Sequence, residues 1–131
     1  MRGAVQDRNT KYTLAIHDWM KRLGHATNLE LLERLRLEFP DVSATTVHRV
    51  TTRLVARREL QLAPSGRDNA MRFDANLAPH DHFLCECCGL LRDVDMKSEI
   101  KPLLERTLGD GCSISGNLTV SGICKRCQKE G

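Results

Sequence analysis

The sequence has few aromatic residues and no long apolar segment. Phe, Trp and Tyr together make up 4% of its 131 residues, whereas hydrophobic residues make up 40%. Any core must therefore be aliphatic, and two small domains built from this chain would need a metal, disulfides or a partner subunit for stability. No apolar run is long enough for a signal peptide or a membrane span, which predicts a cytoplasmic protein with reduced thiols.

Charge is distributed unevenly along the chain. Residues 1–75 contain 13 Lys and Arg against 9 Asp and Glu, and residues 76–131 contain 7 against 8. This N-terminal excess of positive charge is expected of a surface that faces nucleic acid, although an ordinary solvated surface can carry the same excess.

Two amphipathic helices are predicted in the first forty residues. Apolar residues recur at helical spacing from Tyr12 to Leu23, and Gly24 ends that helix. Residues 1–10 are polar and are expected to be loose. Thr27 and Glu30 fit a capping box at the start of the second helix. Its apolar positions are Leu29, Leu32 and Leu35, and Pro40 stops it.

A third helix and a hairpin follow. Ser43 can cap the helix, whose apolar stripe consists of Val47, Val50 and Leu54. The period then changes to an alternation around residues 60–62 and 71–73, separated by a run of turn formers. Three helices followed by a hairpin is the order of a winged helix-turn-helix, in which the third helix enters the major groove of DNA.

The C-terminal half is predicted to mix strands and helix. Strands are expected at residues 82–85 and 90–94, and a helix is expected from Ser98. The apolar residues expected to face inward on this helix are Ile100, Leu103, Leu104 and Leu108, and those expected on returning strands are Ile114, Leu118 and Val120. The predicted fold class is therefore α+β. A winged helix-turn-helix DNA-binding domain over residues 1–75 and a hinge at 76–79 precede a small α/β domain over 80–131.

Two Cys-x-x-Cys turns are the most specific motif in the sequence. Cys85 with Cys88 and Cys124 with Cys127 can point four thiolates at one tetrahedral ion, which is a closed, structural zinc site. Cys87 competes with Cys88 as second ligand, but Gly89 suits a knuckle that ends at Cys88. The alternative is a redox pair with unrelated thiols. The remaining cysteines, Cys87 and Cys112, are interpreted as buried or incidental thiols.

A second group of metal-ligand types surrounds the first knuckle. His80 and His82 are two residues apart, so they share one face of a strand. Asp93 follows the knuckle, Asp74 ends the hairpin, and His25 follows the first helix. Histidine nitrogens with carboxylate oxygens suit Fe²⁺ or Mn²⁺ and also accept Zn²⁺. Such a site would link metal occupancy to the orientation of the two halves. Taken alone, a histidine such as His25 is more often an ordinary surface or capping residue.

These motifs resemble the ferric uptake regulator family. The matching segments are His80-Asp81-His82-Phe83-Leu84-Cys85-x-x-Cys88-Gly89, Gly122-x-Cys124-x-x-Cys127, and Phe39-Pro40-x-Val42-Ser43-x-x-Thr46-Val47-His48-Arg49. The resemblance covers residues 10–127. It implies a homodimer that binds an operator in double-stranded DNA, with a C-terminal dimerisation domain, a structural Zn²⁺ and a regulatory metal at the hinge. Metal binding would favour the DNA-binding form, which usually represses transcription.

Within that family the peroxide-stress regulators look most similar. Their regulatory ligands match His25, Asp74, His80, His82 and Asp93. The resemblance implies that peroxide, reacting at bound Fe²⁺, oxidises His25 or His80 and releases DNA. Zinc-sensing relatives commonly have a Cys in this site, and Asp74 argues against that subgroup. A histidine of a further family metal site is missing around Ser115-Gly116, and the Pro-Gln-Arg stretch common before the first helix is absent.

The candidate DNA contacts lie mainly on the third helix. They are Thr46, His48, Arg49, Arg53 and Arg57, with Arg67 at the tip of the hairpin. Arginine can pair with guanine or phosphate, and threonine with phosphate. A solvated basic face is the alternative. His48 stands where the family usually has a DNA-contacting Tyr, which leaves sequence preference open.

Three other functions remain to be weighed. A metal-dependent enzyme using His80, His82 and an Asp would need a nucleophile–base pair or a substrate-cradling loop, and the sequence suggests neither, so a non-enzyme is expected. An iron- or zinc-responsive uptake regulator would use the same hinge ligands without sensing peroxide. A zinc-stapled DNA-binding module would keep its DNA affinity whatever metal is added.

Overall fold

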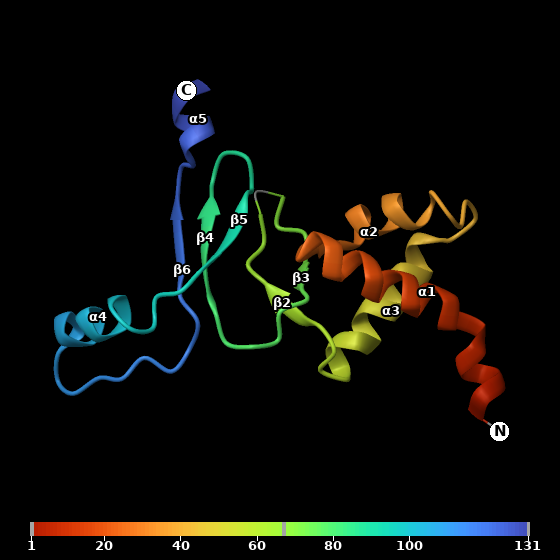
Figure 1. The fold of residues 1–131 in the computed structure, drawn as a ribbon, viewed down its shortest axis with the longest axis horizontal. Helices are drawn as coiled ribbons and strands as arrows, with labels where there is room; N and C mark the ends of the chain where they lie inside the picture. The colour runs from red at the N-terminus through yellow and green to blue at the C-terminus, as the bar shows by residue number, and fades with distance from the viewer. Residues whose placement is uncertain (1, 67, 131) are drawn as a thin grey trace. The chain divides into compact units, whose positions relative to one another are not determined.

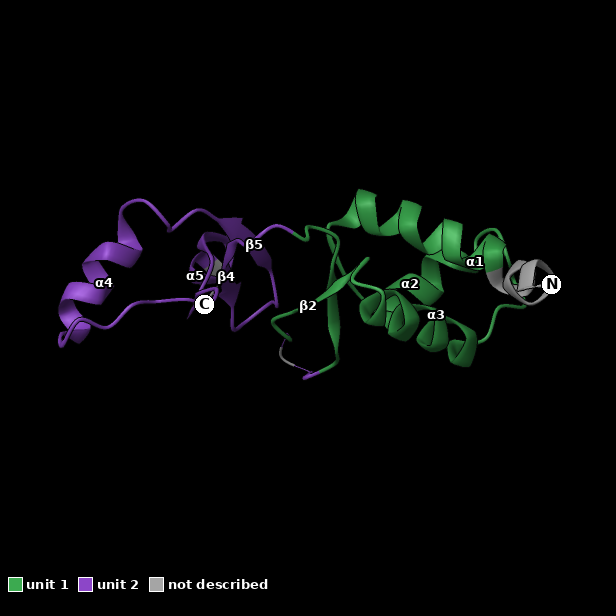
Figure 2. Cartoon of the chain, turned by 90° about the horizontal axis from the view of Figure 1, so that it is seen from below, with its two compact units in different colours: residues 1–65, 70–77 green, residues 66–69, 78–131 purple. Residues whose placement is uncertain are grey.

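The computed structural model describes residues 2–66 and 68–130, and these divide into two compact units (Figures 1 and 2). Unit 1 comprises the residues up to 65 together with 70–77, and unit 2 comprises 66–69 and the residues from 78 onward. Across the described residues, every helix is too short or too polar to span a membrane.

Unit 1 begins with helix α1, which runs over Arg2–Leu23. The expectation that residues 1–10 are loose is wrong for residues 2–10. Helical hydrogen bonding does not require an apolar stripe, and Ala4 and Gln6 are among the residues that favour helix upstream of Tyr12. Gly24 ends the helix as predicted, because it adopts a φ of 79° while its N–H donates to the Met20 carbonyl at 2.8 Å.

Both caps predicted for the next two helices are present. In α2, Asn28–Leu35, the Thr27 hydroxyl accepts from the Glu30 N–H and the Glu30 carboxylate accepts from the Thr27 N–H, a complete capping box. In α3, Ala44–Ala56, the Ser43 hydroxyl accepts from the Thr46 N–H. These caps fix where the two helices start, and therefore which residues of α3 face outward.

A three-stranded sheet completes unit 1. Its order is β1-β3-β2, with β1 His25–Thr27, β2 Gln61–Ala63 and β3 Arg72–Asp74, all antiparallel. The sequence analysis predicted the β2–β3 hairpin but not β1, whose three residues are too few for a visible alternation. Strand β1 places His25 directly opposite Asp74.

The core of unit 1 is aliphatic, as the composition requires. Twelve buried residues form it: Ile16, Met20, Ala26, Leu31, Leu32, Leu35, Val42, Val47, Val50, Leu54, Leu60 and Phe73. The predicted stripe of α3 lies entirely in this core. In α2 the prediction is partly wrong, because Leu29 is exposed and Leu31 is buried in its place. The buried face of α3 leaves its opposite face open to solvent.

Unit 2 is a second three-stranded sheet with two short helices. Strands β4, Asp81–Cys85, and β5, Leu91–Val94, pair antiparallel. Helix α4, Ile100–Leu108, leads to β6, Thr119–Gly122, which pairs parallel to the other side of β4, and α5, Lys125–Glu130, follows. Figure 1 shows β4 between β5 and β6.

Several predictions for unit 2 are corrected. Helix α4 begins at Ile100 rather than Ser98, and its apolar residues do not face inward. Ile100, Leu103, Leu104 and Leu108 are 37–61% exposed in the single chain. Ile114 belongs to no strand, because its N–H donates to the Glu105 carboxylate at 2.7 Å instead of to a neighbouring strand. The short helix α5 carries Cys127 and was not predicted.

The core of unit 1 yields a stability prediction. Leu54→Ala removes a side chain that is 1% exposed, so we expect the free energy of unfolding to fall by about 2–5 kcal/mol, because a cavity replaces its contacts. Leu62→Ala is the matched control, since Leu62 is 56% exposed and its change should have little effect. Urea unfolding of the zinc-loaded variants measures both, and equal losses would contradict the assigned core.

Candidate metal centres and DNA-facing helix

Four cysteines converge in unit 2. Cys85 ends β4, Cys88 lies in the turn that follows, Cys124 precedes α5 and Cys127 lies within it. The Glu86 N–H donates to the Gly122 carbonyl at 2.8 Å, so the two knuckles are tied by backbone as well. The four Sγ atoms all lie within 4.8 Å of one another.

The spacing of these sulfurs fits a tetrahedral zinc ion. The Cys85 and Cys127 Sγ atoms are 3.8 Å apart, as are those of Cys88 and Cys124. With Zn–S bonds of about 2.3 Å, tetrahedral geometry places sulfurs roughly 3.8 Å from one another. The unit therefore contains a four-cysteine cluster positioned for zinc.

Backbone hydrogen bonds lower the pKa of one of the four thiols, that of Cys85. Hydrogen bonds from the N–H groups of Cys124 and Cys88, at 3.4 and 3.5 Å, lower the pKa of Cys85 to about 6 although burial works against them. The hydrogen bond with the Cys124 side chain, together with burial, raises the pKa of Cys127. Metal binding needs deprotonated sulfur, and these backbone hydrogen bonds favour the thiolate form of Cys85.

The other two cysteines lie outside this four-sulfur set. Cys87 and Cys112 are both exposed. The sequence alternative in which Cys87 replaces Cys88 is not favoured by the geometry, because Cys88 supplies the sulfur opposite Cys124.

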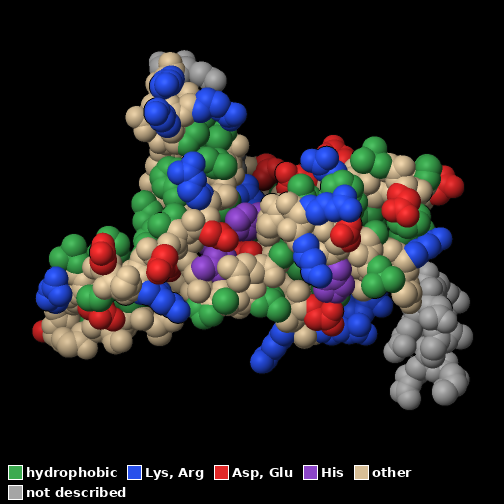
Figure 3. Space-filling view, viewed as in Figure 1, with side chains coloured by type: hydrophobic (Ala, Val, Ile, Leu, Met, Phe, Trp, Pro, Cys, Tyr) green, Lys and Arg blue, Asp and Glu red, His purple; other side chains and the backbone are tan. Residues whose placement is uncertain are grey.

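Basic residues border the cysteine cluster. Arg92, Lys125 and Arg126 line a hollow together with Cys88, Leu90 and Cys124. Figure 3 shows Lys and Arg side chains gathered over the region of α5. Four thiolates around a divalent ion carry net negative charge, and neighbouring cations partly neutralise it.

The second predicted ligand group is divided between the two units, and each part is described by itself. In unit 1, pairing of β1 with β3 sets His25 against Asp74, with 3.5 Å between His25 Nε2 and Asp74 Oδ2. Asp74 is 1% exposed, and its other oxygen accepts from the Asn76 N–H at 2.9 Å. A buried carboxylate is thus held with one oxygen beside an imidazole nitrogen.

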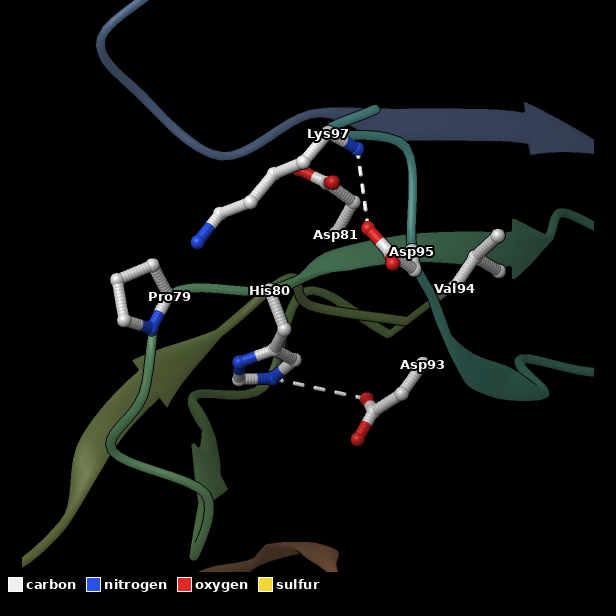
Figure 4. Close-up of a pocket in the computed structure, with 7 residues that line it drawn as sticks. All are labelled: Pro79, His80, Asp81, Asp93, Val94, Asp95 and Lys97. Atoms are coloured by element: carbon white, nitrogen blue, oxygen red, sulfur yellow. Dashed lines mark hydrogen bonds and ion pairs between the residues drawn. The ribbon is translucent and has the colours of Figure 1, made fainter. Parts of the chain in front are cut away.

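In unit 2, β4 and β5 bring two histidines to one carboxylate. His80 Nε2 and His82 Nε2 lie 3.6 and 3.3 Å from the same oxygen of Asp93. Figure 4 shows the His80 ring pointing toward the Asp93 carboxylate. Ligand atoms about 2.1 Å from a shared ion lie roughly 3.0–3.6 Å apart, so the three side chains fit joint coordination.

The tautomer of His80 is also suited to a metal. Its Nδ1 lies 2.6 Å from the Ala78 carbonyl, which can only accept, so Nδ1 carries the proton. The lone pair of the neutral ring is then on Nε2, the atom that faces Asp93. Metal-binding histidines are commonly oriented in this way by a second hydrogen bond. Beside His80 lies a cavity of about 310 Å³ that is also lined by Pro79, Asp81, Asp95 and Lys97.

On α3, the predicted contact residues lie outside the core as a group. His48, Arg49 and Arg57 are exposed, and Thr46 and Arg53 are half-buried. Thr46 is engaged locally, because its hydroxyl oxygen accepts from Ser43 at 3.0 Å. Arg67 lies outside the described residues.

Sequence reasoning missed two residues that position these groups. Asn28 joins α2 to α3: its amide lies 3.2 Å from His48 Nδ1 and its oxygen accepts from the Thr51 hydroxyl at 2.8 Å. Asp81, between the two candidate ligand histidines, is 1% exposed. Burial works to raise its pKa, but hydrogen bonds from the Leu118 and Met96 N–H groups and the Lys101 ammonium lower it. The capping pattern and the His-x-His motif contained these residues without revealing their partners.

Comparison with known proteins identifies the family. The model of the ferric uptake regulator family matches residues 5–116. The peroxide-responsive repressor PerR of Staphylococcus epidermidis is 30% identical over 113 residues, covering 82% of this chain and 72% of that protein. The structure of Helicobacter pylori Fur superposes with a TM-score of 0.74 at 21% identity over 97% of this chain and 89% of that one. The Campylobacter jejuni peroxide stress regulator gives 0.72 at 22%, covering 95% of each. This chain belongs to the ferric uptake regulator family.

Proposed function

We propose that the protein is a metal-dependent DNA-binding transcriptional repressor that acts as a homodimer in the cytoplasm. Residues 1–75 would bind an operator, 76–79 would be the hinge, and 80–131 would dimerise and bind metal. The observation that carries the proposal is the convergence of His80 and His82 on Asp93, with the His80 tautomer set for coordination.

The regulatory metal would be bound by five side chains, namely His25, Asp74, His80, His82 and Asp93. Their nitrogen and oxygen ligands suit Fe²⁺ or Mn²⁺, whereas the four cysteines Cys85, Cys88, Cys124 and Cys127 suit structural Zn²⁺. Ligands from both units would let metal occupancy bias the arrangement of the units and so DNA affinity. Bound Fe²⁺ would activate peroxide beside its ligands; one peroxide oxygen would be inserted into the imidazole of His25 or His80 and the other released as water, so that overall the imidazole would supply the two electrons.

A dimer would explain the exposed apolar face of α4. The residues of this face, each 37–61% exposed within the described chain, are Ile100, Leu103, Leu104 and Leu108. Contiguous apolar surface of this kind favours association. A partner subunit is the expected cover in a family of regulators with twofold operators.

DNA-binding measurements with different metals test the sensing role. Zinc-loaded protein is titrated with a selected operator duplex after addition of Fe²⁺, Mn²⁺ or Zn²⁺, before and after peroxide. Tightening with Fe²⁺ that is lost on peroxide, with oxygen added at His25 or His80 by mass spectrometry, is the expected result. Tightening that survives peroxide would indicate a metal-responsive uptake regulator. Affinity that ignores every metal would leave a zinc-stapled DNA-binding module.

The structural site has its own test. The wild-type protein should keep one zinc ion per chain through dialysis against a weak chelator. Cys127→Ser should lose this ion, because a hydroxyl replaces a buried thiolate ligand. Cys87→Ser is the matched control and should retain it. Zinc is measured by elemental analysis, and loss of zinc in both variants would mean that Cys87 is also a ligand.

The regulatory site predicts a separable phenotype. His82→Ala should retain zinc but bind the operator with an affinity that no longer depends on Mn²⁺, since the ring nitrogen beside Asp93 is gone. His17→Ala is the control, because the His17 ring pairs at 2.9 Å with Glu59, which is not a candidate ligand. A full Mn²⁺ response in the His82 variant would contradict the ligand assignment.

The exposed face of α3 predicts an arginine effect. Arg49→Ala should weaken operator binding by about 1–3 kcal/mol if the guanidinium reads a base, or reduce the salt slope by about 1 if it contacts phosphate. Arg22→Ala, an exposed arginine of α1 paired with Asp18, is the control. Fluorescence anisotropy over a range of salt concentrations measures both, and identical behaviour of the two variants would remove Arg49 from the interface.

A further inference from the structure

Strand β4 has two chemically different faces. His80 and His82 lie on one, and the alternating residues Asp81, Phe83 and Cys85 lie on the other. Figure 4 shows Asp81 directed to the opposite side of the strand from His80. Asp81 is therefore not placed to share a metal ion with its two neighbours, and its carboxylate has other partners.

Those partners come from three separate segments of unit 2. One carboxylate oxygen accepts from the Leu118 N–H at 2.8 Å and lies 3.4 Å from the Lys101 ammonium. The other accepts from the Met96 N–H at 3.1 Å. Lys101 in turn donates to the Gly116 carbonyl at 3.1 Å, and its side chain is 14% exposed. The carboxylate thus joins β4 to the segment that follows β5, to the start of α4 and to the segment before β6.

These contacts hold the backbone on both sides of the candidate ligands. Asp81 is the strand residue between His80 and His82, and Met96 lies three residues after Asp93. Asp81 pairs with Val94 and His82 pairs with Asp93 in the same ladder. A shift of either strand would change the distances between the histidine nitrogens and the Asp93 oxygen, and Asp81 opposes such a shift from the far side of β4.

We propose that the Asp81–Lys101 ion pair is a positioning pair for the regulatory metal. It touches no ligand atom, and it acts by holding β4 and β5 in the register that brings His80 and His82 to Asp93. Because Lys101 is the second residue of α4, the pair also ties the ligand strands to the helix that carries the exposed apolar face. The inference rests on the proposed function, since it presumes that these three side chains bind the regulatory ion.

The test measures Mn²⁺ affinity of the zinc-loaded full chain. Asp81→Asn and Lys101→Met should each weaken Mn²⁺ binding by about 10-fold or more, as loss of groups that orient metal ligands commonly does. Lys101→Arg should retain most of the wild-type Mn²⁺ affinity, because a guanidinium can still reach the Asp81 carboxylate. The double variant Asp81→Asn with Lys101→Met should lose no more than the worse single variant, because the two act as one unit.

Two controls separate positioning from general destabilisation. Glu105→Gln alters a carboxylate that likewise accepts a backbone N–H in unit 2, that of Ile114, which belongs to no strand. Arg106→Met removes an exposed positive charge from the same helix as Lys101 without removing a partner of Asp81. Both should keep wild-type Mn²⁺ affinity, and zinc content and the melting temperature without Mn²⁺ are recorded for every variant.

The outcomes are distinguishable. If the wild type binds Mn²⁺ and both pair variants bind it equally tightly, the positioning role is overturned while the proposed function stands. If Glu105→Gln loses as much affinity, or if both pair variants lose their zinc, the pair is merely structural and the inference is overturned. If the wild type binds no second metal, the proposed function fails and the inference fails with it.

Discussion

The convergence of four thiols is the constraint on which the C-terminal unit depends. Apart from Cys85, Cys124 and Cys127, the buried hydrophobic residues among the described part of that unit reduce to Met96. So small an apolar core cannot offset the conformational entropy of about fifty residues. The knuckles close the ends of β4 and β6 on each other, and a metal held there would supply the missing stabilisation.

Strand β4 connects the cysteine cluster to the histidines of the second candidate metal site. Its C-terminal residue is a cysteine of the cluster, one of its faces carries His82, with His80 just before the strand, and the opposite face carries Asp81. One cysteine of the cluster and two candidate regulatory ligands thus lie within residues 80–85. The sulfur cluster closes the end of the strand, and the two histidines would bind the separate regulatory metal proposed above.

The N-terminal unit is stabilised by an aliphatic core and by helix caps. Its aliphatic core buries one side of α3, and the caps at Thr27 and Ser43 determine where α2 and α3 start. Asn28 then holds His48 on the outer side through a network that ends at the buried Thr51 hydroxyl. Packing of this kind fixes the backbone positions from which the outer side chains of α3 project, which lowers the ordering cost of binding a partner.

The sequence by itself determined what depends on local spacing: the cysteine knuckles, the two caps, the stripe of α3 and the types of ligand in the His/Asp group. Helix caps and alternating faces follow from contacts between residues two to four apart, so they are readable from sequence. Only the tertiary structure decided the pairing of His25 with Asp74 through β1, the parallel course of β6, the exposure of the apolar residues of α4, and the partners of Asp81. Each of these joins segments far apart in the chain, and such pairings are selected by the packing and hydrogen bonding of the whole unit.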